Sequence, residues 1–375
     1  MEYTLGVIGL GHWFSWLTTG IGVEGGLDLK KAVGTKPFDE KKELLSKFGI
    51  TENNYYISDQ NGNFPGQFFE GINIVHISDP NKFHKSQAIE SLNNGKYVIV
   101  EKTIAANEQE FNEIKNLVQK NNYNDRLYLH LHYLHKQPTI ALRTMLPDFI
   151  KQNGKIKSIQ ATFFEDTNKE DPKRTWLLAL ENGGIFMDWI HSFEVIYYTT
   201  KCNFGNIIEL KSFVVNASYD SKNPTGIESK IVLKGANYAE GAFAVIRSAK
   251  GVDKEHANKS IKFVFESDDY LLLCFPGHEV EFNTEERGRI QLISKHGETL
   301  MSQSFTGMNS SEIFIEEIID FCKGKHKGLK MHEIEEIFKP QWEYQKLAKS
   351  SKLILDSDGI LEFLEQGISG MACGT

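Results

Sequence analysis

Two glycines near the N-terminus stand where a backbone turn could hold a phosphate. Gly9 and Gly11 follow an apolar run at residues 3–8 and precede a segment that fits a helix. Glycines at such a turn let the backbone approach a pyrophosphate closely, and the charge then lies at the helix N-terminus. The spacing therefore predicts a dinucleotide site, with an ordinary tight turn as the alternative. We expect the next three residues to contribute to it: His12, Trp13 and Phe14, the last in place of the usual third glycine.

A second position could select between the two nicotinamide cofactors. The apolar run at 29–34 is followed by Thr35 and Lys36. Sites specific for NAD usually place an aspartate or glutamate there, which binds the ribose hydroxyls. A hydroxyl followed by a cation suits a 2′-phosphate better, so we predict NADP as the cofactor, with NAD as the alternative. Under the simplest interpretation, Lys36 is an ordinary solvated lysine.

Three histidines raise the question of a metal site. His130 and His132 lie two residues apart on a predicted strand, so they share one face, and His135 follows. Zinc and iron sites use such H-x-H pairs. No third ligand is evident nearby in the sequence, and we therefore expect no metal cofactor.

The elements that must position these residues alternate regularly in the N-terminal part. Short apolar runs predict strands at 3–11, 29–34, 72–78, 96–100 and 126–134. Amphipathic segments predict helices at 39–49, 83–95 and 107–122, with Gly49 and Gly95 as stops and Asn107 as an N-cap. This alternation is typical of a doubly wound parallel sheet, and we predict a Rossmann dinucleotide-binding domain over residues 1–133.

The pattern changes beyond residue 134. Strand-like segments follow one another at 156–166, 207–219, 228–235, 241–248, 260–267, 270–275 and 289–295. One helix is expected near 184–199, and two more at 310–324 and 332–354. We therefore predict an α+β domain over residues 134–375, with a large, mostly antiparallel open sheet.

Composition excludes several classes of protein. The 375 residues carry 42 basic and 50 acidic side chains, a net charge of −8, so neither a nucleic-acid partner nor a membrane partner is expected. The four cysteines are far apart with no C-x-x-C pair, which predicts neither a zinc knuckle nor a disulfide framework. No long apolar run and no leader segment is apparent, so we expect a cytoplasmic protein.

A longer motif carries a specific resemblance. Residues 80–103 are similar to the P-N-x-x-H…G-K-x-V-x-x-E-K-P signature of the glucose-fructose oxidoreductase/inositol dehydrogenase/MocA family, although Thr103 replaces the final proline, which in the family usually forms a cis-proline turn. The matching residues are Pro80, Asn81, His84, Gly95, Lys96, Val98, Glu101 and Lys102. The resemblance implies that the cofactor site includes Ser78, Pro80, Asn81, His84, Glu101 and Lys102. It also implies that Lys102 binds the substrate, hydrogen-bonds its reacting oxygen and stabilises developing charge there.

A second part of the family signature lies in the predicted C-terminal domain. Family members carry G-G-x-x-x-D and then H-x-x-D on a helix that faces the nicotinamide, and this chain has GGIFMDWIHSFE at 183–194. Asp188 and His191 are three residues apart rather than four, which still places both on one helical face. The resemblance implies that His191 is the general base and that Asp188 orients the substrate or assists Lys102. The alternative is a histidine that caps or satisfies a buried helix.

Further substrate-binding residues rest on weaker similarities. The preceding segment resembles a family loop that would bring Arg174 or Trp176 to the pocket, although both residue types are also common in packing and at surfaces. Residues 132–136 resemble the H-Y-L-G-K segment of glucose-6-phosphate dehydrogenases, and Arg247 with Lys250 resembles their R-x-G-K strand. In those enzymes the residues hold a sugar phosphate, which implies an anion pocket of His132, Lys136 and also Lys250.

These expectations combine into one functional hypothesis. The chain should transfer hydride between NAD(P) and a hydroxyl or carbonyl carbon of a sugar, sugar phosphate or cyclitol. The alternative is an inactive regulatory protein of the same fold that binds dinucleotide or sugar. By resemblance we also expect residues 134–375 to bind the substrate and to mediate oligomerisation, as a homodimer or homotetramer.

Overall fold

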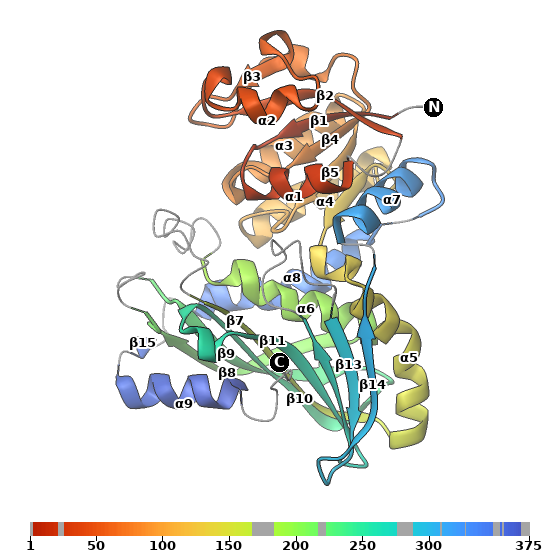
Figure 1. The fold of residues 1–375 in the computed structure, drawn as a ribbon, viewed down its shortest axis with the longest axis vertical. Coiled ribbons are helices and arrows are strands. Elements are labelled where there is room, and N and C mark those ends of the chain that lie inside the picture. The colour runs from red at the N-terminus through yellow and green to blue at the C-terminus, as the bar shows by residue number, and fades with distance from the viewer. Residues whose placement is uncertain are drawn as a thin grey trace. The chain divides into compact units, whose positions relative to one another are not determined.

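The computed structural model describes residues 3–21, 26–166, 184–216, 223–275, 288–307, 310–326, 328–347, 353–354 and 356–368 (Figure 1). Its contacts divide the chain into two compact units. One comprises Met1–His132 and Met308–Ile334, and the other Tyr133–Gly307 and Glu335–Thr375. No described helix has the length and apolar character needed to cross a membrane.

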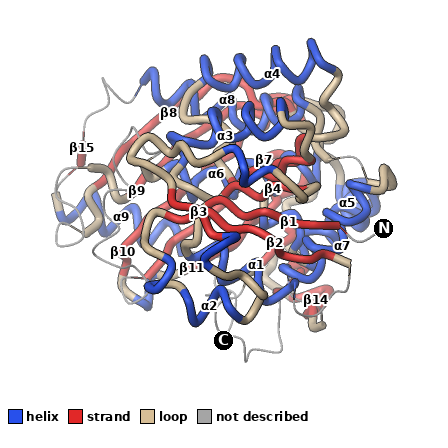
Figure 2. Tube along the Cα trace, turned by 90° about the horizontal axis from the view of Figure 1, so that it is seen from above, coloured by secondary structure: helices blue, strands red, loops and turns tan. Residues whose placement is uncertain are grey.

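The N-terminal unit contains a parallel sheet. Among the described residues it has six strands in the order β3-β2-β1-β4-β5-β6. The strands are β1 (Tyr3–Ile8), β2 (Leu27–Gly34), β3 (Tyr55–Ile57), β4 (Ile74–Ile77), β5 (Tyr97–Glu101) and β6 (Leu127–His130). Figure 2 shows α1 (His12–Ile21) and α2 (Lys42–Ser46) on one side of these strands and α3 (Asn81–Asn93) and α4 (Glu108–Asn121) on the other. The predicted doubly wound sheet is confirmed, and the short strand β3 was not predicted.

Local sequence signals explain where these helices begin and end. The Asn107 side chain accepts a hydrogen bond from the backbone N–H of Glu110, as an N-cap does. Gly95 follows α3 with φ +72°, and Gly49 follows α2 with φ +73°, in the left-handed region that glycine adopts readily. All three predicted helix boundaries are therefore confirmed.

A C-terminal helix belongs to the N-terminal unit, which the predicted division at 133/134 did not include. The helix α7 (Ser310–Cys322) buries Phe314 and Ile318 in the core around β1 and α1. The Phe314 ring lies 5.6 Å from that of Trp16, and Ser311 Oγ lies 2.7 Å from Thr19 Oγ1. The apolar face of α7 thus supplies a surface that α1 needs for burial. Spacing along the chain carries no sign of this pairing.

The second unit contains a mostly antiparallel sheet, as predicted. Its described part has nine strands in the order β14-β13-β12-β11-β7-β10-β9-β8-β15, in which the pairs β7/β10 and β8/β15 are parallel. The strands are β7 (Ile156–Asp166), β8 (Asn203–Phe213), β9 (Gly226–Lys234), β10 (Tyr238–Val252), β11 (Asn258–Phe265), β12 (Tyr270–Cys274), β13 (Gly288–Ile293), β14 (Thr299–Phe305) and β15 (Leu353–Ile354). Cys274 at the end of β12 forms a disulfide bond, which the wide spacing of the cysteines did not predict.

Helices cover this sheet on two faces. They are α5 (Gln137–Asn153), α6 (Phe186–Thr200), α8 (Met331–Leu347), which begins within the other unit, and α9 (Ser357–Ile368). Phe163 and Phe164 are neighbours on β7 and therefore point to opposite faces. The Phe163 ring lies 6.1 Å from His191 of α6, and the Phe164 ring lies 5.1 Å from Phe363 of α9. The helix near 184–199 was predicted, whereas α5 and α9 were not.

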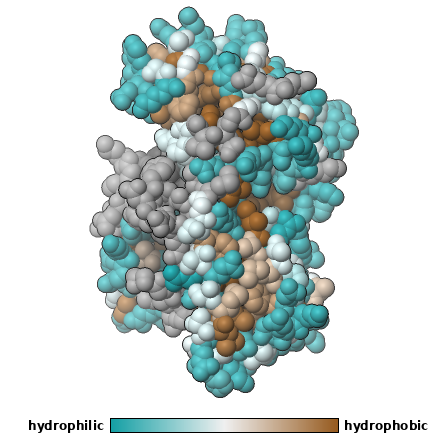
Figure 3. All heavy atoms as spheres, turned by 45° about the vertical axis from the view of Figure 1, so that its right-hand side comes forward, coloured by the Kyte–Doolittle hydropathy of each residue, from teal (hydrophilic) through white to brown (hydrophobic). Residues whose placement is uncertain are grey.

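Most surface side chains are hydrophilic on the face drawn in Figure 3, with smaller hydrophobic areas between them. The large hydrophobic side chains that are exposed in the described part of the chain are Ile57, Ile208, Leu300, Leu347 and Leu361. They come from different elements, and the oligomeric state stays a prediction.

Candidate active site

The turn between β1 and α1 is shaped for a close approach to the backbone. Gly9 has φ +95°, and a Cβ atom on it would lie 2.6 Å from the carbonyl carbon of Ser78, so a side chain cannot fit there. Gly11 is exposed, and a Cβ atom on it would meet no described atom within 4 Å. The turn therefore presents side-chain-free backbone at the N-terminus of α1, as a bound pyrophosphate requires.

This turn lies where the strand order reverses, between β1 and β4. Ser78, directly after β4, donates hydrogen bonds to the carbonyl oxygens of Gly9 (3.0 Å) and Ile8 (3.3 Å). The N–H of Gly9 bonds to the carbonyl oxygen of Val33 on β2. The ends of three neighbouring strands are thus joined around the glycine turn, at the point of an open sheet where ligands typically bind.

The side chain of Phe14, a predicted cofactor residue, lies in the core, and its cofactor role stays a prediction. Phe14 is completely buried and packs in the core, with its ring 6.3 Å from that of Phe48. A glycine at this position would let the helix pack closely against the sheet. Phe14 instead places its side chain between them, as a core residue. The predicted His12 and Trp13 side chains lie outside the described part of the structure.

Thr35 and Lys36 are exposed just beyond β2. The Lys36 ammonium lies 2.7 Å from the Glu40 carboxylate, and both side chains are at least half exposed. The hydroxyl of Tyr55 donates to the Lys36 carbonyl oxygen at 2.6 Å, which holds the backbone in place. An exposed ion pair of this kind contributes little stability, so a ligand phosphate could replace Glu40 as the partner of Lys36.

The residues of the second motif lie at the start of α3 and at the end of β5. Pro80 is the N-cap residue of α3, and Asn81 and His84 are buried in its first turn. Lys102 follows β5 directly and is also buried, with 9% of its surface exposed. The peptide bond between Lys102 and Thr103 is cis, although threonine stands in the place of the family's proline.

Glu101 forms a buried cluster with two histidines. One carboxylate oxygen accepts from His76 Nε2 at 3.3 Å and from His130 Nδ1 over a short hydrogen bond. The His130 ring stacks on Phe314, with centroids 3.7 Å apart. Burial raises the pKa of Glu101, but the charges and hydrogen bonds of His130 and His76 outweigh it and hold the pKa well below its ordinary value.

The cluster bears on two predictions, the cofactor role of Glu101 and the absence of a metal at His130. Glu101 was expected at the cofactor. Its carboxylate bonds to the two buried histidines, and only 2% of the residue's surface is exposed. The sheet also supplies ligand types that were not evident beside His130 in the sequence, since atoms of His76, Glu101 and His130 lie within 4.8 Å of one another. Glu101 is already hydrogen-bonded to both histidines, and the expectation of no metal stays a prediction.

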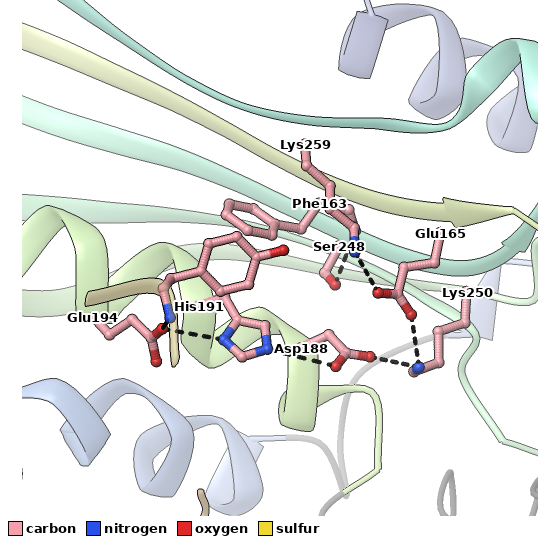
Figure 4. A network of polar contacts seen from close by, with 9 residues as sticks. Phe163, Glu165, Asp188, His191, Glu194, Ser248, Lys250 and Lys259 are labelled. Atoms are coloured by element: carbon pink, nitrogen blue, oxygen red, sulfur yellow. Dashed lines mark hydrogen bonds and ion pairs between the residues drawn. The ribbon is translucent and has the colours of Figure 1, made fainter. Parts of the chain in front are cut away.

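The second unit gathers charged side chains along α6 and the neighbouring strands (Figure 4). Asp188 lies 2.7 Å from the ammonium of Lys250 on β10 and 3.8 Å from His191 Nε2. Lys250 also pairs with Glu165 of β7 at 3.0 Å, because the two residues are register partners in the parallel pair β7/β10. Lys259 of β11 approaches the other oxygen of Glu165 at 2.7 Å. These contacts form a chain of alternating positive and negative charges, in the order Lys259, Glu165, Lys250 and Asp188.

His191 is held from its other side by a buried carboxylate. Its Nδ1 lies 3.3 Å from Oε1 of Glu194, which has no exposed surface and also accepts the backbone N–H of Tyr133 at 3.0 Å. Because a carboxylate only accepts, this contact assigns the proton to Nδ1. A neutral His191 then carries its lone pair on Nε2, the nitrogen that faces Asp188. Such a histidine can take up a proton and share the resulting charge with Glu194.

The other predicted substrate residues have different surroundings in the structure. Arg174 and Trp176 lie outside the described residues. The buried Lys136 ammonium lies 4.6 Å from the Tyr133 ring centroid and 5.6 Å from that of Phe275. Lys250, expected to bind phosphate, is instead balanced by two carboxylates. His132 is buried at the end of the N-terminal unit.

Sequence reasoning missed several residues of this cluster, namely Glu165, Glu194, Lys259 and Tyr133. The spacing of His191 and Glu194, three residues apart on one helical face, was a usable signal for Glu194. For Glu165 and Lys259 no local signal existed, because their contacts depend on strand pairing.

Comparisons with known proteins agree with this architecture. Residues 28–124 match the sequence model of an oxidoreductase family with an NAD-binding Rossmann fold, Gfo/Idh/MocA. Among curated proteins none matches the chain. The local similarity to glucose-6-phosphate dehydrogenases is not supported by these comparisons and stays a prediction.

Solved structures share the fold at low sequence identity. An aldose-aldose oxidoreductase from Caulobacter crescentus is 14% identical, with a TM-score of 0.71 over 93% of this chain and 98% of that one. A 3-ketoreductase from Actinomadura kijaniata, solved with NADP, is 12% identical, with a TM-score of 0.71 over 95% and 100%. A UDP-N-acetylglucosamine 3-dehydrogenase from Acidithiobacillus ferrooxidans is 13% identical, with a TM-score of 0.65 over 91% and 96%.

Proposed function

This chain belongs to the Gfo/Idh/MocA oxidoreductase family through residues 28–124, and from this premise we propose that it is an NAD(P)-dependent oxidoreductase. Its substrate is a sugar, sugar phosphate or cyclitol, oxidised or reduced at a CH–OH carbon. The similar structures named above include an aldose-aldose oxidoreductase, a 3-ketoreductase and a UDP-N-acetylglucosamine 3-dehydrogenase, which supports this substrate class.

The observation that carries the proposal is the buried His191, held by Glu194 on one nitrogen and facing Asp188 with the other. The glycine turn fits a dinucleotide, which Gly9, Gly11 and Ser78 would hold. When bound, the nicotinamide supplies or accepts the hydride.

The protein's own groups would handle the proton. His191 Nε2 accepts the proton of the reacting hydroxyl during oxidation and returns it during reduction. Glu194 keeps the imidazole in the required tautomer and stabilises its protonated form. Asp188, oriented by Lys250, accepts a hydrogen bond from a substrate hydroxyl. Lys102 keeps the role that the family motif implies, donation to the reacting oxygen.

Turnover of a sugar panel tests the proposal. The purified protein is mixed with NADP⁺ or NADPH and a set of aldoses, ketoses, cyclitols and their phosphates, and the absorbance of the reduced nicotinamide is followed. An active enzyme changes this absorbance with at least one member. A protein that binds NADPH but turns over none of them is the regulatory protein instead.

Cofactor preference gives a first quantitative prediction. NADP(H) should bind at least ten-fold more tightly than NAD(H), a difference of about 1.4 kcal/mol, because Thr35 and Lys36 replace the ribose-binding acid. Fluorescence titration of the four cofactor forms measures it. Lys36→Ala should remove most of the preference, and Glu40→Gln should increase it by releasing Lys36 from its ion pair.

Lys42→Ala is the matched control, because Lys42 is an exposed lysine of the same region. Equal affinity for the two cofactors, or an NAD preference that Lys36→Ala leaves unchanged, contradicts this assignment.

A phosphate on the substrate gives a second prediction. If Lys136 contributes to an anion pocket, a sugar phosphate should have a higher kcat/KM than its free sugar, and Lys136→Ala should remove most of that advantage. Lys151→Ala, an exposed lysine on the same helix, should have no effect. A free sugar used as well as its phosphate would restrict the substrate class to uncharged sugars or cyclitols.

A further inference from the structure

A single buried imidazole joins two loops of the N-terminal unit. His84, in the first turn of α3, is 1% exposed. Its Nε2 lies 2.6 Å from the carbonyl oxygen of Asp79, and its Nδ1 lies 2.7 Å from the carbonyl oxygen of Thr103. Asp79 belongs to the loop after β4, and Thr103 to the loop after β5.

Both partners of His84 only accept hydrogen bonds, so the ring must donate to them. A neutral imidazole has one N–H, whereas a protonated one donates to both carbonyls. Burial is the largest influence and lowers the pKa of His84, while the two carbonyl oxygens and the Asp79 and Glu101 carboxylates act in the opposite direction. The ring nitrogens lie within hydrogen-bond distance of both loops, and the ring donates to at least one of the two carbonyls in either protonation state.

The Asp79 side of this link is fixed by a second contact from the same helix. The side-chain amide of Gln87, which is buried, donates to Asp79 Oδ2 at 2.8 Å. Helix α3 therefore holds both the backbone and the side chain of Asp79. The other side of the link is the Thr103 carbonyl, one residue from Lys102, so α3 is anchored to the backbone that carries this lysine.

From this geometry we propose that His84 is a positioning residue for Lys102 rather than a contact of the cofactor. By holding the Thr103 carbonyl, His84 fixes the direction in which the Lys102 side chain leaves the sheet. The consequence for turnover rests on the proposed function, in which Lys102 donates to the reacting oxygen. A displacement of about 1 Å in such a group can lower the rate by about 10²-fold.

The test is a double-mutant cycle of His84→Phe and Lys102→Ala. Phenylalanine keeps a buried ring but removes both hydrogen bonds. In the parent chain His84→Phe should lower kcat by about 10–10²-fold, with KM and the Kd of NADPH changed less than about threefold. In the Lys102→Ala background it should cause no further loss. Equal losses in both backgrounds, or an unchanged kcat in the parent, overturn the proposal.

Two further variants control for misfolding and for a general disturbance of α3. His84→Gln, whose amide can donate to one of the carbonyls, should retain more activity than His84→Phe and replaces it in the cycle if the latter does not fold. Ser86→Ala changes an exposed residue of the same helix and should leave kcat unchanged. A loss with Ser86→Ala as large as that of His84→Phe would assign the effect to general disturbance of α3.

A readout that needs no substrate separates this proposal from the proposed function. The rate at which an amine-specific reagent labels Lys102, followed by mass spectrometry, should change at least about threefold in His84→Phe, while that of Lys96 stays constant. Lys96 donates to the Ile72 carbonyl oxygen and serves as the reference lysine. If the parent turns over no sugar but this rate changes, the function is wrong and the positioning role stands. If it does not change, the positioning role is wrong.

Discussion

Replacing His191 with alanine should lower kcat by about 10²–10⁴-fold, the usual loss when a positioned general base is removed. The affinity for NADPH should change little, since the glycine turn that would hold the dinucleotide belongs to the other unit. Steady-state kinetics with the best sugar of the panel, together with cofactor titration, measures both quantities.

Companion variants locate the base within the cluster. Asp188→Asn should cause a smaller loss, because it keeps size and hydrogen bonding but removes the charge opposite Lys250. His296→Ala, at an exposed position between β13 and β14, is the control and should be silent. Near-normal turnover of His191→Ala combined with loss of activity in Asp188→Asn would show that Asp188 is the base and that our assignment is wrong.

Replacing Glu101 with leucine should lower the free energy of unfolding by about 3–5 kcal/mol, because two buried imidazole N–H groups lose their common acceptor. Glu101→Gln should cost less, since its amide oxygen can still accept. Urea titrations measure these differences. Glu113→Gln removes the charge from the partly exposed pair with Lys85 and should cost less than about 1 kcal/mol.

The effect of Glu101 should depend on pH in a definite direction. Its folded-state pKa lies well below the ordinary value, so its charge stabilises the fold above about pH 4.3 and this contribution is lost as the pH falls further. The stability difference between the parent and Glu101→Leu should therefore be largest near neutral pH and shrink in acid. A difference that stays constant from neutral to acidic pH would contradict an ionised Glu101 in the folded chain.

Local signals in the sequence were enough for the elements and for part of the site. Short apolar runs identified the parallel strands other than β3, Asn107 and two glycines marked helix ends, and Gly9 marked the turn that a side chain would block. These features depend on residues a few positions apart, and short-range sterics and hydrogen bonding decide them. The pair Asp188 and His191 was accessible in the same way, because helical spacing alone places both on one face.

Tertiary structure decided what those residues are joined to. Register between β7 and β10 sets Glu165 beside Lys250, and the packing of α6 sets Glu194 beneath the backbone of Tyr133. The same holds for α7, whose apolar face packs on α1 and completes the N-terminal core, with Ser311 and Thr19 in contact across 292 positions of the chain. A charged residue at a buried position, or an apolar helix face, indicates that a packing or ion-pair partner is needed. Which partner it finds depends on burial and strand pairing between distant segments, and these exist only once the chain has folded.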